Sequence, residues 1–222
     1  MKGLLAKDFN ILLLQKKFLG MILAITVIML MTMEEPSFLV AYLTVTCGIM
    51  TLSTLSYDEF DHGNTFLFTL PITRKEYVWS KYVLSVLVSG CAWLSATIVS
   101  VLVSVIKVEG YAVADGIAEA VMTFAVCMLI VFIMIPIQIK YGGEKSRVVI
   151  LAIAGIGVIL GCLLQVLAER LEGIVSIDVE AMFRYIDAIG LPGLVAVAVG
   201  AGAVVMVISM VISERIMEKK QF

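Results

Sequence analysis

Charged residues are scarce in this chain of 222 residues: they make up 15% of it, whereas hydrophobic residues make up 61%. A water-soluble globular protein carries roughly 25% charged residues, so the composition excludes that class. Six long stretches contain no charge at all, and most reach the length of about 20 residues that crosses a bilayer as a helix. Barrel strands need only about ten alternating residues, so we expect an all-α integral membrane protein.

Cysteine and histidine are also rare. The four cysteines lie in four different apolar stretches, without CxxC spacing: Cys47, Cys91, Cys127 and Cys162. We interpret them as small packing residues. His62 is the only histidine, so a metal site there would need Asp58, Glu59 and Asp61 beside it. We interpret this segment instead as a solvated polar turn and expect no metal ion.

Ionisable side chains are missing from the middle of the apolar stretches. Coupled carriers and intramembrane enzymes need such groups at mid-membrane to bind, relay or catalyse. The most polar large side chains in the predicted spans are Gln138 and Gln165, each near the end of a span. The sequence has no HExxH and no GxxxxGK[ST] motif. We therefore expect no enzyme activity from this chain, which must take energy from a partner or serve as a passive element.

We predict a single transmembrane domain, residues 1–222, with six spans. Their approximate bounds are 16–33, 37–57, 74–106, 117–139, 148–168 and 188–213. Lys and Arg are retained on the cytoplasmic side of a membrane. Thirteen of the 16 Lys and Arg residues precede the first charge-free stretch, follow the sixth, or lie between stretches two and three or four and five. This distribution predicts that both termini lie in the cytosol.

The segments next to the spans contain two further patterns. Residues 4–14 are amphipathic, with Leu5, Phe9 and Leu12 on one face, and predict an interfacial helix; a cytosolic extension of the first span is the alternative. Tyr141–Arg147 is typical of a tight glycine turn between spans four and five.

The loop between spans two and three predicts a cytosolic elbow. Pro71 ends a short helix, and Thr73 with Glu76 forms a capping box that starts the third span at Arg74. Ile72 and Tyr77 occupy the hydrophobic staple positions of this cap. The third span would be about 50 Å long, which is more than a membrane requires.

The elbow carries apolar side chains that we expect to be exposed, namely Phe66, Leu67 and Phe68, beside the basic Arg74 and Lys75. A rigid apolar protrusion of this kind suits docking to a soluble partner. An elbow that only anchors in lipid headgroups is the alternative.

Small residues repeat at a spacing of four in the last two spans. The repeats are Gly157-x-x-x-Gly161, Ala196-x-x-x-Gly200 and Ala198-x-x-x-Gly202. Such patterns allow two helices to approach closely. Packing within the chain and packing between chains are both open, and we favour packing within the chain.

Three blocks of the sequence carry a resemblance to a known family. They are Leu4–Phe9, then Tyr57–Glu59 with Leu70–Tyr77 and Ser80–Tyr82, and finally Gly142–Arg147. Together they resemble the permeases of type-2 ABC exporters, and within that family the small six-span group that includes the phenol-soluble modulin exporter permeases of Gram-positive bacteria. Family members often have Ser before the arginine, where this chain has Thr73, a change that keeps the helix cap.

The resemblance implies an exporter of the bacterial cytoplasmic membrane in which two permease chains, identical or different, pair with two cytosolic ATPase subunits. ATP and Mg would be bound by the ATPase, and this chain would bind membrane lipid but no cofactor of its own and no nucleic acid. The residues implied to couple to the ATPase are Glu59, Phe66, Leu67, Phe68, Leu70, Pro71, Thr73, Arg74, Lys75 and Glu76. Those implied to make a secondary cytosolic contact are Lys7, Asp8, Glu144, Lys145 and Arg147.

The charge-free spans suit an amphipathic or antimicrobial-type peptide as cargo better than an ion or a sugar. Two alternatives stay open: an exporter of lipid-like small molecules, and a non-transporting accessory or immunity membrane protein. An adjacent gene for a nucleotide-binding ATPase would favour the exporter.

Overall fold

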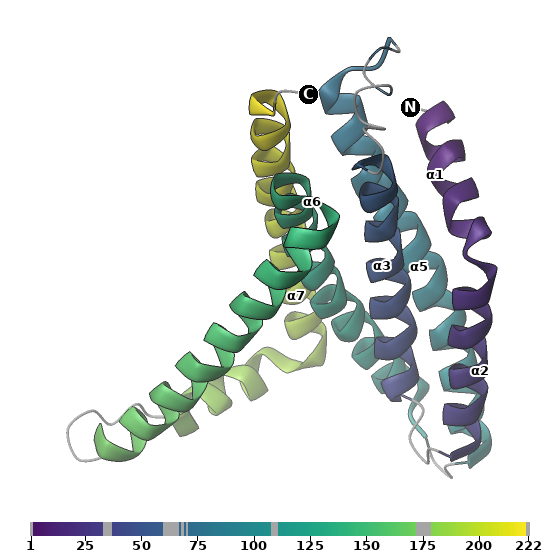
Figure 1. The fold of residues 1–222 in the computed structure, drawn as a ribbon. Helices are drawn as coiled ribbons and strands as arrows, with labels where there is room; N and C mark the ends of the chain where they lie inside the picture. Colours follow the sequence, from purple (N-terminus) through teal and green to yellow (C-terminus); the bar gives the residue numbers. More distant parts are fainter. Residues whose placement is uncertain are drawn as a thin grey trace.

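The structure, a computed structural model, describes residues 2–32, 37–59, 67, 69, 71–107, 111–171 and 179–220. Within these ranges the regular secondary structure is helical, which confirms the all-α prediction there. The helices are α1 (Lys2–Leu14), α2 (Lys16–Thr32), α3 (Ser37–Glu59), α5 (Arg74–Lys107), α6 (Val113–Leu171) and α7 (Val179–Lys219). Figure 1 shows both termini at the same end of the helix bundle.

Two glycines break the longest helices. Gly142 in α6 has φ 80° and ψ 172°, and Gly190 in α7 has φ 66° and ψ 167°. Glycine alone adopts this backbone region readily, so each helix consists of two parts joined at a bend. The second part of α6 runs outward from the bundle, and the first part of α7 leads back to it (Figure 1). The predicted glycine turn at residues 141–147 is therefore confirmed at Gly142.

Four described helical segments are long and apolar enough to cross a membrane. They are Ser37–Glu59, Arg74–Lys107, Val113–Gly143 and Pro192–Lys219. The first predicted span, α2, qualifies as a fifth only together with α1, from which it is bent by 65°. For the predicted span 148–168, only the shorter apolar helix Val148–Gly157 is found among the described residues. Four of the six predicted spans thus coincide with helices that are long and apolar enough to cross a membrane, and the count of six and the orientation stay predictions.

The core of the bundle lies where α3, α5 and α6 meet. Val78 of α5 and Val131 of α6 are fully buried there. A Cβ added to Gly48 of α3 would lie 2.6 Å from Cγ2 of Val131 and 3.0 Å from Oγ of Ser89. This glycine therefore allows α3 to approach α5 and α6 at once, as small residues do between membrane helices.

Three glycines of the small-residue repeats do not pack within the chain in the way we favoured. Among the residues that the structure describes, no atom outside the local helix lies within 4 Å of a Cβ added at Gly157, Gly200 or Gly202. The expectation that these three glycines pack closely within the chain is therefore wrong. Spacing alone did not show which glycines face a neighbouring helix.

A proline in α6 is compensated by a serine in α7. Pro136 has no N–H, so it cannot donate to the carbonyl of Phe132 four residues earlier. The hydroxyl of Ser209 donates to that carbonyl, and it also shares a hydrogen bond of 2.6 Å with the hydroxyl of Tyr82 in α5. Tyr82 is fully buried and bonds Ser213 as well, at 2.9 Å. These polar contacts join α5, α6 and α7 inside the apolar bundle.

We predict that Ser209→Ala lowers the free energy of unfolding by about 1 kcal/mol, since it leaves the Phe132 carbonyl without a donor. Ser213→Ala, the matched control, removes only the bond to Tyr82 and should cost less. In a Pro136→Ala background the helix supplies its own N–H, so the cost of Ser209→Ala should shrink. Reversible unfolding in bicelles measures all four variants. Equal costs of Ser209→Ala in both backgrounds would contradict this account.

Candidate functional site

The end of α3 and the start of α5, which flank most of the predicted coupling residues, lie at the end of the bundle that carries both termini (Figure 1). The elbow loop, residues 60–73, joins the end of α3 to the start of α5 at this end. Phe66, Phe68 and Leu70 lie outside the described residues, as do the side chains of Glu144 and Arg147. The described positions Pro71, Thr73, Lys75 and Lys145 are exposed. They form the part of the predicted site that a soluble partner can reach.

The predicted start of α5 is confirmed by its cap. The backbone N–H of Thr73 donates to Oε2 of Glu76 at 3.1 Å, and the N–H of Glu76 donates to Oγ1 of Thr73 at 3.2 Å. These are the two reciprocal bonds of a capping box. Ile72 and Tyr77, at the predicted staple positions, belong to the same apolar cluster. A local sequence pattern therefore sets where the elbow loop ends.

Leu67 does not lie where the sequence analysis expected it. Its side chain is only 7% exposed, and it belongs to the same core cluster as Leu4, Tyr77 and Met217. The expectation that Leu67 is exposed is therefore wrong. It anchors the elbow loop on the bundle, because burial of a leucine against neighbouring helices is favourable.

A buried ion cluster joins α1, α3 and α5. The ammonium of Lys81 lies 2.7 Å from Oδ2 of Asp58 and 2.8 Å from Oδ2 of Asp8. The ammonium of Lys7 lies 2.5 Å from Oδ1 of Asp58 and 3.4 Å from Oδ1 of Asp8. The side chains of Asp8, Asp58 and Lys81 are at most 4% exposed, and that of Lys7 is 34% exposed. We call these four residues the ion cluster; its two cations balance its two carboxylates.

Neutral groups complete the shell of the ion cluster. The hydroxyl of Tyr77 donates to Oδ2 of Asp58 at 3.0 Å, and Lys81 donates to Oγ1 of Thr54 at 3.2 Å. Removing one partner from such a buried pair typically costs about 3–5 kcal/mol, because a charge is left without compensation. The ion cluster therefore makes the relative positions of the three helices specific.

The ion cluster corrects one expectation. Asp58 is not part of a solvated turn, since it is 5% exposed; of the apolar residues predicted on one face of α1, Leu12 is buried and Leu5 packs beside it. Leu4, Asp8 and Leu12 are buried, whereas Phe9 is 52% exposed. The spacing of four residues between Leu4, Asp8 and Leu12 could have indicated that they are buried together, because residues at this spacing share one helix face. An aspartate in that register needs a buried cation.

Glu59 connects α3 to the bend of α6 and to the C-terminal end of α7. Its Oε2 accepts the N–H of Gly143 at 2.9 Å, and its Oε1 accepts Lys220 at 2.7 Å. Lys220 also donates to the carbonyl of Ile139 at 3.0 Å. A Cβ at Gly142 would lie 2.7 Å from Oε2 of Glu59. The glycine at this bend is thus required both by its positive φ and by the space that Glu59 occupies.

Arg74 connects the start of α5 to the end of α7. Its Nη1 donates to the carbonyls of Met217 at 2.9 Å and Glu218 at 2.6 Å. The last carbonyls of a helix lack helical donors, so a guanidinium is a favourable cap for them. Lys75 lies 3.9 Å from Glu218 with both side chains more than half exposed, a pair that contributes little. The described contacts of Arg74 are therefore within the chain.

We call the ion cluster together with Glu59 and Arg74 the elbow hub. Asp58 and Glu59 precede the elbow loop, and Arg74 and Lys81 follow it. Through these residues both ends of the loop are bonded to α1, to the bend of α6 and to the end of α7. The two ends of the elbow loop are therefore connected to several helices at once. The described residues contain no group of three or more metal-ligating side chains.

We predict that Lys81→Met lowers the free energy of unfolding by about 3–5 kcal/mol, because Lys7 alone then faces two carboxylates in the ion cluster. The double variant Lys81→Met with Asp8→Leu leaves one pair, Lys7 with Asp58, and should recover much of that loss. Lys75→Met, the matched control at an exposed pair, should cost about 0–1 kcal/mol. A double variant as unstable as Lys81→Met in detergent unfolding would contradict this prediction.

Comparison with known proteins assigns the chain to a family. A family model described as "ABC-2 family transporter protein" matches residues 3–218. No curated protein and no solved structure matches the chain. Because the match extends over nearly the whole chain, and because the described helices include several that can cross a membrane, the chain belongs to the ABC-2 family of transporter proteins.

Proposed function

We propose that the chain is the permease subunit of an ATP-driven ABC exporter and that separate ATPase subunits on the cytosolic side energise it. Membership of the ABC-2 transporter family supports this proposal. The observation that carries the coupling role is the elbow hub, in which both ends of the elbow loop are bonded to distant helices. ATP and Mg would be bound by the ATPase, and this chain would supply the membrane path.

The elbow loop is the proposed docking element for the ATPase. Phe66, Phe68 and Leu70 would fill an apolar groove on the partner, and the exposed Thr73 and Lys75 would contact its rim. Buried apolar anchors provide most of the binding free energy of such interfaces, while rim charges provide little. Leu67 has no part in this proposal, since its side chain is buried in the bundle. Lys145, exposed beside the α6 bend, is a candidate for a secondary contact.

A second permease chain, identical or different, would complete the path. The open faces of Gly157, Gly200 and Gly202 support this, because no atom outside the local helix in the described part of the chain lies within 4 Å of a Cβ added there. Small residues of this kind allow close packing between membrane helices. The second part of α6, which leaves the bundle, presents exposed Leu151 and Ile156 and is a further candidate for that contact.

The proposed cargo is an amphipathic peptide, as in the phenol-soluble modulin exporters that the sequence resembles. A cavity of about 390 Å³ between α2, α3 and both parts of α6 supports this choice. Its lining combines apolar side chains such as Phe18 and Ile150 with the uncharged polar Gln15, Ser53 and Gln138. A lining with both characters suits an amphipathic segment better than an ion. A lipid-like small molecule, or an accessory role without transport, are the alternatives.

We predict that the double variant Phe66→Ala with Phe68→Ala abolishes co-purification of a co-expressed ATPase, since each central anchor typically contributes about 2 kcal/mol or more to binding. Insertion in the membrane should be unchanged. Leu67→Ala is the matched control: it should lower the stability of the chain but leave the ATPase bound. Affinity purification from membranes with both subunits gives the readout. If the ATPase stays bound to the double variant, the elbow only anchors in lipid and the docking role is wrong.

A further inference from the structure

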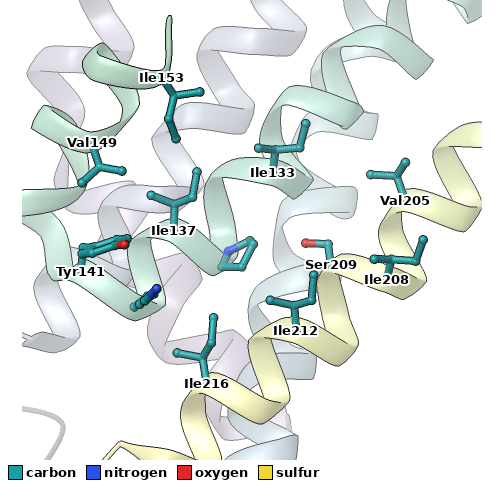
Figure 2. Close-up of a pocket in the computed structure, with 12 residues that line it drawn as sticks. Ile133, Ile137, Tyr141, Val149, Ile153, Val205, Ile208, Ser209, Ile212 and Ile216 are labelled. Atoms are coloured by element: carbon teal, nitrogen blue, oxygen red, sulfur yellow. The ribbon is translucent and has the colours of Figure 1, made fainter. Parts of the chain in front are cut away.

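A second groove lies beside the α6 bend. It has a volume of about 450 Å³ and is formed by both parts of α6 and the second part of α7. Figure 2 shows isoleucines of α6 on one side of it and isoleucines of α7 on the other. Most lining residues are apolar; they include Ile133, Ile137, Val149, Ile153, Ile208 and Ile212. The proposed cargo cavity does not include these residues.

One end of this groove is polar and cationic. Lys140 lines it and is exposed, and its ammonium lies 4.9 Å from the centre of the Tyr141 ring. An ammonium over an aromatic face is a favourable arrangement. Unlike Lys81 and Lys220, Lys140 has no carboxylate partner among the residues that the structure describes. The groove therefore ends at a cation whose charge the described part of the chain does not balance.

The position of Lys140 along α6 places this cation at the surface of the membrane. Residues 120–139 carry no charge, and Lys140 is the first charged residue after them. The charge-free part of α7 ends at residue 213, next to Ile212, which lines the groove. Ile133 lies seven residues before Lys140, or about 10 Å deeper along the helix. The groove thus runs from the headgroup level into the hydrocarbon region.

We propose that this groove binds an anionic phospholipid of the surrounding membrane. The phosphate would lie at the ammonium of Lys140, and one acyl chain would follow the isoleucines of α6 and α7. Tyr141 is the kind of residue that lies at the headgroup level of membrane proteins. Because the groove is bounded by both parts of α6, the lipid would occupy the angle at Gly142. The proposal does not depend on transport, so it stands or falls separately from the proposed function.

Native mass spectrometry of the purified full chain tests this, with phosphatidylglycerol and phosphatidylcholine of the same acyl chains. We expect the unaltered chain to retain phosphatidylglycerol preferentially, and Lys140→Gln to lower that preference about fivefold, the effect of one lysine at an anionic surface. Lys145→Gln, at an exposed lysine near the same bend but outside the groove, is the matched control and should keep the preference. Added inorganic phosphate should not displace the lipid.

A filled groove provides the second test. Ile212→Trp should reduce binding of both lipids, while the thermal midpoint of the chain shows that the variant is folded. An equal loss of preference in Lys140→Gln and Lys145→Gln would mean that surface charge alone attracts the lipid, and would overturn the proposal. An intermolecular disulfide formed by Ile208→Cys would place a second copy of the chain in the groove and would also overturn it.

Discussion

The ion pair between Asp58 and Lys81 is the interaction on which the end of the bundle with both termini depends. It joins the last turn of α3 to the second turn of α5 at 2.7 Å, and so it closes the base of the elbow loop. Lys81 then brings in α1 through Asp8, at 2.8 Å. A buried charge needs a compensating partner, so the three helices have one favourable arrangement here.

The neighbouring contacts extend this constraint to α6 and α7. Glu59, next to Asp58, accepts the N–H of Gly143 at the α6 bend, and Arg74 donates to the last carbonyls of α7. Farther into the bundle, Ser209 replaces the donor that Pro136 lacks. Polar bonds of this kind define the register of apolar helices, since apolar contacts alone have little directional preference. Under the proposed function, the elbow hub would move as one unit when the ATPase displaces the elbow loop.

Local patterns predicted local structure well. Short segments of sequence were enough to predict the capping box of Thr73 and Glu76, the glycine bend at Gly142 and the family. Charge-free runs were enough to predict four helices that are long and apolar enough to cross a membrane. Burial of Asp8 and Leu67 was missed, because it depends on which face of α1 and which residue of the loop contact other helices. The partner of a charged residue far along the chain cannot be identified from composition.

The central claim of the proposed function, that the elbow hub moves as one unit, is tested by electron paramagnetic resonance distances in a complex with the proposed ATPase. Spin labels at Asn10 of α1 and Trp79 of α5 occupy exposed positions, each two residues along the chain from a member of the ion cluster. A label at Ile153, also exposed, reports on the second part of α6. The account predicts that addition of ATP and Mg changes the distance between Trp79 and Ile153 and leaves that between Asn10 and Trp79 unchanged. A change between Asn10 and Trp79 would contradict it.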